Sequence, residues 1–84
     1  MNAADQLKQD LKKGTAILGT EVNLKKLRKG ELKKIYVAHN CKDKDAIKHY
    51  AQQTGTQVIE LEQTNVEVGV ICKKPFSISA LGFE

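Results

Sequence analysis

Residues 18–30 read LGTEVNLKKLRKG, and this stretch decides how the chain is built. A short apolar run stops at Gly19, which can take backbone conformations that are closed to other residues. Thr20 is a fair N-cap, so we expect a helix that begins there and stops at Gly30. The beginning of a helix presents free backbone N–H groups and a partial positive charge, and lysine and arginine side chains follow here within three turns. The junction therefore suits a polyanion.

The length and charge of the chain restrict what it can be. Its 84 residues, 40% of them hydrophobic, are enough for one small domain with a compact core, and we expect a single domain over residues 1–84. The net charge of +4 is uneven, because the first 34 residues hold nine basic against four acidic side chains and the remainder holds five against six. This excess favours a nucleic acid or another acidic surface as partner, although an ordinary solvated helix face also collects lysines.

Neither a membrane span nor a secretory signal is visible. No stretch approaches the roughly 18 consecutive apolar residues of a span, and the N-terminus lacks the basic start and apolar core of a signal peptide. We therefore expect an intracellular protein without membrane contact. Cys41 and Cys72 are expected to stay reduced rather than form a disulfide, and Cys72 follows Val70 and Ile71 as a small buried hydrophobe would.

Apolar spacing and turn residues predict helices that alternate with strands. Helices are expected over 3–13, 20–30 and 43–55, followed by one that Thr64 caps and the turn 73–75 ends. Strands are expected over 15–18, 34–38, 57–61 and 76–81. Several of these strands are uniformly apolar, which is typical of a sheet covered on both faces. We therefore predict an α/β fold, a three-layer α/β/α sandwich around a mixed four-stranded sheet.

One end of such a sheet is the expected site, because loops there bring together residues that are distant in sequence. The turn at Gly19, the strand end at Asn40 and the turn 73–76 are predicted to meet at this edge. Phe76 follows two lysines and a proline, and an aromatic ring on a basic turn can stack on an unpaired base while lysines hold phosphates. A place in the core is an equally common role for such a ring.

Patterns for catalysis, cofactors and metals are missing. The soft ligands His39, Cys41, His49 and Cys72 match no zinc spacing, and no glycine-rich nucleotide motif occurs. Ser77 and Ser79 alternate with apolar residues as in a half-buried strand, and acidic residues near position 43 suit a helix start. We expect no enzyme, no cofactor and no metal. Gly69, inside a predicted helix, suggests close approach by another backbone, with internal packing favoured over a ligand.

Several blocks in order resemble the L7Ae/L30e superfamily of archaeal and eukaryotic RNA-binding proteins, and most closely its large-subunit ribosomal branch. The resemblance covers nearly the whole chain. It rests on residues 19–30, on IYVAHN at 35–40, on Tyr50-Ala51 before Gly55, and on TNVEVG at 64–69 running to PFSISAL at 75–81.

The resemblance implies a non-enzymatic protein that grips a kink-turn, a sharply bent RNA element with tandem sheared G·A pairs. By analogy, the helix N-terminus at Gly19 and Thr20 would meet the kinked strand, Glu21 and Lys25 would address the G·A pairs, and Asn40 would bond a nucleotide. The loop after the fourth helix would close over an extruded base. The candidate RNA-binding residues are Gly19, Thr20, Glu21, Lys25, Arg28, Asn40, Lys73, Lys74 and Phe76.

Two departures from the family pattern stand out. The Asn-Glu pair of the L7Ae branch is replaced by Glu21-Val22, which favours the ribosomal branch, and the loop glycine often found near position 73 is a lysine. We expect a cytoplasmic protein of the large ribosomal subunit that contacts rRNA and neighbouring ribosomal proteins and is a monomer when free. Two alternatives stay open: a free-standing kink-turn protein of guide-RNA particles or regulatory leaders, and a protein-interaction module of the same fold.

Overall fold

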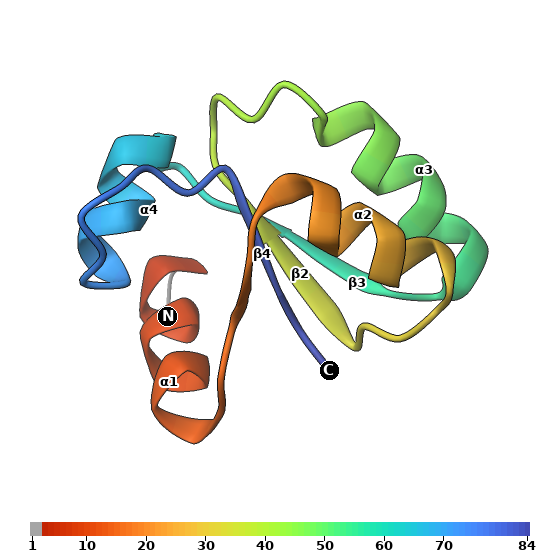
Figure 1. Ribbon diagram of the computed structural model, residues 1–84, viewed down its shortest axis with the longest axis horizontal. Helices are drawn as coiled ribbons and strands as arrows, with labels where there is room; N and C mark the ends of the chain where they lie inside the picture. The colour runs from red at the N-terminus through yellow and green to blue at the C-terminus, as the bar shows by residue number, and fades with distance from the viewer. Residues whose placement is uncertain (1–2) are drawn as a thin grey trace.

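The computed structural model describes residues 3–84. Helices and strands alternate along the chain, as Figure 1 shows. The helices are α1 (Ala3–Lys13), α2 (Thr20–Arg28), α3 (Lys44–Thr54) and α4 (Asn65–Ile71). The strands are β1 (Ile17–Leu18), β2 (Lys34–Val37), β3 (Gln57–Glu60) and β4 (Ala80–Phe83). The strand order is β1-β4-β2-β3, with β2 parallel to β3 and β4 antiparallel to both of its neighbours, so the predicted mixed four-stranded sheet is confirmed.

Helices cover both faces of the sheet and create two separate cores. In Figure 1, α1 and α4 lie on one side of the strands, and α2 and α3 lie on the other. Alternate residues of β2 point to opposite faces, so Tyr36 packs in the first core while Ile35 and Val37 pack in the second. Leu7 of α1 and Val68 of α4 join the first core. This arrangement confirms the α/β/α sandwich and explains why β2 is apolar throughout.

The last strand lies further along the chain than we predicted. We expected it over 76–81, but β4 covers Ala80–Phe83, and residues 76–79 form a loop that returns across α4. Hydrogen bonding explains the difference, because the Ile78 N–H donates to the Asn65 carbonyl oxygen at 3.0 Å instead of to a strand. The prediction that Ser77 and Ser79 belong to a half-buried strand was therefore wrong.

The start of α2 also differs in detail. Thr20 was expected as the N-cap, but the N-cap is Gly19 and Thr20 is the first helical residue. Gly19 has φ 109°, a region that residues with a side chain rarely adopt, and as a glycine it leaves the first N–H groups of α2 without a side-chain cap. By contrast, Thr64 caps α4 as predicted, since its hydroxyl accepts from the Glu67 N–H in a capping box. None of the helices in residues 3–84 is long and apolar enough to cross a membrane.

A polar contact anchors α1 to the sheet. The Asp10 carboxylate accepts hydrogen bonds from the buried Tyr36 hydroxyl and, at 3.1 Å, from the Lys34 ammonium group. Burial opposes ionisation of Asp10, but the two hydrogen bonds and the Lys34 charge outweigh it, so the pKa of Asp10 lies below its ordinary value. Burial, together with the Asp10 contact, raises the pKa of Tyr36. Asp10 is therefore held as an anion.

Asp10→Asn is expected to destabilise the protein at pH 7 by about 1 to 2 kcal/mol, because the ion pair with Lys34 is lost. The folded-state pKa of Asp10 is lowered, so its contribution is present above about pH 4 and disappears as the pH falls through the folded-state value. Urea unfolding of both proteins at pH 7 and near pH 2 measures this difference. Exposed Glu62 supplies the control Glu62→Gln, and an Asp10→Asn effect that persists at pH 2 would contradict the assignment.

Candidate functional site

The ends of β1 and β2 and the beginning of β4 meet at one edge of the sheet. The Gly19 N–H donates to the Ala80 carbonyl oxygen at 3.4 Å, and the Ala38 N–H donates to the Ser79 carbonyl oxygen at 2.8 Å. These bonds tie the β1–α2 junction, the loop before β4 and the end of β2 to one another. In Figure 1 they lie together at the upper end of the sheet. The predicted convergence is therefore present for the Gly19 turn and the end of β2, which residues 79 and 80 join. The predicted third segment, the turn 73–76, lies earlier in the same connection between α4 and β4.

Asn40 is fixed at this edge by a residue that the sequence analysis missed. The Asn65 N–H donates to Asn40 Oδ1 at 2.8 Å, and Asn40 Nδ2 donates to Asn65 Oδ1 at 3.0 Å. The Asn65 carbonyl oxygen also accepts from Ile78, so Asn65 connects the loop after β2, the start of α4 and the loop before β4. Asn40 itself stays exposed. A polar residue directly after the Thr64 cap was the only sequence signal for this role.

Phe76 is not a core residue. It is 53% exposed, and Val22, Val66 and Val70 are the other large hydrophobic residues exposed within residues 3–84. Within α4, Val68 is fully buried in the core, whereas Val66 and Val70 point to solvent. All four exposed side chains belong to α2, to α4 or to the loop between α4 and β4, which are the elements that border the edge. An exposed aromatic ring at this place is available for stacking on a planar group.

Gly69 lets the loop that carries Phe76 lie directly on α4. A Cβ at position 69 would overlap the Phe76 carbonyl oxygen and lie 3.2 Å from its carbonyl carbon. The Lys74 N–H also donates to the Gly69 carbonyl oxygen at 3.0 Å. The expectation of close internal approach at Gly69 is confirmed, and the approaching backbone is that of the loop between α4 and β4.

The first turns of α2 present charged side chains beside the edge. Glu21 and Lys25 are exposed and lie four residues apart, so they share one face of the helix. Beneath them Asn23 is fully buried, and its Nδ2 donates to the carbonyl oxygens of Ile17 at 2.8 Å and Gly19 at 2.6 Å. Asn23 was not predicted as a functional residue. Its signal was an asparagine inside a helix, where that residue is disfavoured unless its amide has a partner.

Arg28 lies away from the edge. It is the last residue of α2, about 12 Å along the helix axis from Thr20 at 1.5 Å per residue. Its guanidinium lies over the Tyr50 ring of α3, 4.9 Å from the ring centroid. This cation–π contact packs α2 against α3. Arg28 is thus a candidate residue whose side chain contacts a neighbouring helix at a distance from the edge.

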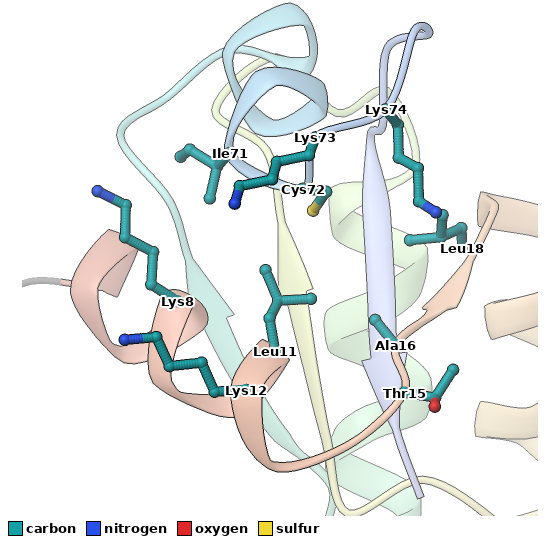
Figure 2. Close-up of a pocket in the computed structure, with 10 residues that line it drawn as sticks. All are labelled: Lys8, Leu11, Lys12, Thr15, Ala16, Leu18, Ile71, Cys72, Lys73 and Lys74. Atoms are coloured by element: carbon teal, nitrogen blue, oxygen red, sulfur yellow. The ribbon is translucent and has the colours of Figure 1, made fainter.

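Lys73 and Lys74 begin the loop after α4, and both are exposed. Lys73 has φ 59°, the left-handed conformation that favours glycine, so this lysine takes a backbone shape that the glycine of the family pattern would adopt more easily. Both side chains also border a pocket between α1 and the end of α4 (Figure 2). Lys73 and Lys74 therefore lie between the edge and the face of the sheet that α1 covers.

Residues 3–84 contain no group of three or more His, Cys, Asp or Glu side chains arranged to hold a metal ion. Cys41 and Cys72 are both free, and Cys72 is partly exposed rather than fully buried as we had expected. Burial raises the pKa of each thiol, which disfavours the reactive thiolate.

Comparison with known proteins connects this geometry to a family. Residues 1–84 match the model of the family described as ribosomal protein L7Ae/L30e/S12e/Gadd45. The protein belongs to this family. A relative from Methanococcus maripaludis, named large ribosomal subunit protein eL30, is 41% identical over 70 residues, which cover 81% of this chain and 70% of the relative.

Two further L7Ae/L30e family members of the same name cover more of the chain. The protein from Archaeoglobus fulgidus is 39% identical over 77 residues, covering 89% of this chain and 85% of the relative. The protein from Methanosarcina mazei is 35% identical over 81 residues, covering 96% of this chain and 77% of the relative. The resemblance to the L7Ae/L30e superfamily is thus confirmed, and the relatives belong to its ribosomal branch.

Proposed function

We propose that this protein is a structural constituent of the large ribosomal subunit in the cytoplasm and binds a kink-turn or a related internal loop of rRNA at the edge described above. Family relatives named as large-subunit ribosomal proteins support the first part. The proposed role needs no catalysis and no cofactor. Other large-subunit proteins would be its neighbours, and the free protein would be a monomer.

The observation that supports the proposal is the set of hydrogen bonds that joins the Gly19 junction, Asn40 and the loop before β4 at one edge of the sheet. Phe76 lies in the same loop, two residues before Ile78, and its side chain is exposed. Gly19 begins a helix whose free N–H groups attract phosphate oxygens. Asn40 uses one of its two Nδ2 hydrogens for Asn65, so the other remains able to donate to a nucleotide. These groups together suit a bent backbone beside an unpaired base.

The charged residues around this edge divide between base and phosphate contacts. In a sheared G·A pair the guanine O6 and N7 atoms stay open to a lysine such as Lys25, and the neighbouring Glu21 can accept from an amino group. Lys73 and Lys74 would neutralise phosphates that the kink crowds together, while the exposed ring of Phe76 stacks on an extruded base. Recognition would mainly read the shape of the RNA.

A mobility-shift titration with a kink-turn RNA tests the proposal. Its control is the same RNA with both G·A pairs replaced by Watson–Crick pairs. We expect the intact kink-turn to bind much more tightly, because the replacement removes both the bend and the open guanine edges. Equal binding to the two RNAs would leave only general basicity. Competition between rRNA fragments and guide-RNA or leader kink-turns separates the ribosomal role from that of a free-standing kink-turn protein.

Lys25→Ala is expected to weaken kink-turn binding by about 1 to 3 kcal/mol, the usual value of a base-edge contact. Lys29→Ala removes the same charge from an exposed position at the far end of α2 and is the matched control. Affinity measured for both variants at a single fixed salt concentration decides the assignment. A loss of the same size in the two variants would show that Lys25 contributes charge alone.

A further inference from the structure

A pocket of about 560 Å³ lies between α1, the start of β1 and the end of α4. Figure 2 shows Leu11 of α1 facing Cys72 at the end of α4, with lysines extending around them. The lining consists of Lys8, Leu11, Lys12, Thr15, Ala16, Leu18, Ile71, Cys72, Lys73 and Lys74. The proposed RNA edge uses only the last two of these residues.

The floor of the pocket is apolar and continuous with the core. Leu11, Ala16, Leu18, Ile71 and Cys72 are all partly buried, and each packs against the core between the sheet and the α1 and α4 helices. Their outer surfaces remain open to solvent. Covering these aliphatic groups with an aliphatic side chain would therefore be favourable, by about 25 cal/mol for each Å² removed from water.

The rim carries four positive charges and no negative charge. Lys8, Lys12, Lys73 and Lys74 line the pocket together with neutral residues only. Within residues 3–84, the salt bridges are all made by other lysines, in Lys26–Glu31, Lys26–Glu84, Lys34–Asp10, Lys44–Glu60 and Lys48–Glu60. The four rim ammonium groups thus have no carboxylate partner in this part of the chain, and they would attract an anionic group from outside.

The lining argues against two other kinds of occupant. A small-molecule site fixes its ligand with a few rigidly placed polar groups, whereas the polar groups here are flexible lysine side chains and one exposed threonine. An RNA strand could pair its phosphates with the lysines, but it would find no aromatic ring on which to stack a base, and its polar backbone would leave the aliphatic floor without an apolar partner. Aliphatic floor and cationic rim instead match a peptide that alternates aliphatic and acidic side chains.

We propose that this pocket is a docking site for an acidic segment of another protein, which inserts leucine-like side chains between α1 and α4 and pairs its carboxylates with the lysine rim. This docking site would bind a protein, whereas the edge would bind RNA. It also includes side chains of α1, which the edge does not use. An RNA element and a protein partner would then share only the Lys73–Lys74 corner.

Titration of the isotope-labelled protein with the peptide EELLEELLEE, followed by NMR, tests this proposal. We expect saturable shifts at Leu11, Ala16, Leu18 and Ile71, and none at Val58 on the opposite side of the sheet. EESSEESSEE keeps the charge without the apolar side chains, and KKLLKKLLKK keeps the leucines with the opposite charge. Neither control peptide is expected to produce these shifts.

The double variant Lys8→Glu/Lys12→Glu is expected to weaken binding of EELLEELLEE by about tenfold, because two attractive contacts become repulsive. The matched control Lys29→Glu/Lys33→Glu makes the same charge change at exposed residues outside the pocket and should leave peptide affinity within about twofold. Circular dichroism checks that each variant is folded. Kink-turn RNA binding is measured in parallel, and Lys8→Glu/Lys12→Glu should bind this RNA as tightly as the control variant does. Failure of the docking proposal can then be told apart from failure of the proposed RNA function.

Three results would overturn the proposal. The first is a titration with EELLEELLEE that leaves the pocket resonances unchanged. The second is equally tight binding of EESSEESSEE, which would show that the apolar floor takes no part. The third is a kink-turn RNA with a lengthened stem that loses affinity in Lys8→Glu/Lys12→Glu but not in the control, because that result would assign this surface to RNA.

Discussion

Gly69→Ala is expected to destabilise the protein by about 3 kcal/mol, although alanine is the better helix former by about 1 kcal/mol. The added Cβ would overlap the Phe76 carbonyl oxygen and lie 3.2 Å from the Phe76 carbonyl carbon. Both contacts are with backbone, so no side-chain rotation relieves them. The loop must move away from α4, which also moves Phe76 and weakens kink-turn binding. Thermal unfolding should show a fall in Tm on the order of 15 °C.

Gly14→Ala is the matched control for this prediction. Gly14 is exposed, is not among the residues of positive φ, and has no neighbouring heavy atom within 4 Å of the place that a Cβ would occupy. The same chemical change there should alter the free energy of unfolding by less than about 0.5 kcal/mol. Equal stability of Gly69→Ala and Gly14→Ala would contradict the close packing of the loop on α4.

Asn23→Ala is expected to destabilise the protein by about 2 to 3 kcal/mol and to weaken RNA binding. The substitution removes two hydrogen bonds, to the carbonyl oxygens of Ile17 and Gly19, and leaves a cavity at a fully buried position. These bonds hold the start of α2 against β1. The Gly19 junction would therefore lose its fixed orientation, and urea unfolding together with RNA titration measures both effects.

Gln52→Ala, on the exposed surface of α3, is the control for deletion of an amide side chain and should be nearly neutral. Gly82→Ala tests the same packing of α2 from the side of β4. The added Cβ would overlap Asn23 Oδ1 and lie 2.9 Å from Leu32 Cδ1. It should therefore destabilise the protein as well. A neutral Asn23→Ala would show that α2 is held by its apolar contacts alone.

Local signals in the sequence were sufficient for most of the secondary structure. The spacing of Leu7 and Leu11 located α1, Gly55 marked the end of α3, and Thr64 marked the start of α4. The apolar run at β2 indicated a strand covered on both faces, and thereby the layered fold. These features depend on residues within a few positions of one another, so they can be read without a structure.

The sequence by itself also indicated that the Gly19 junction and the strand end at Asn40 lie at one edge, because strand ends in an open sheet converge. Only the tertiary structure decided which partners hold them there. Asn65 fixes Asn40 from 25 positions away, and Gly82 in β4 leaves room for Asn23 of α2. The tertiary structure also moved β4 to residues 80–83 and placed Arg28 on Tyr50. The physical reason is that hydrogen bonds and packing between distant segments produce no periodic pattern of residues in the sequence.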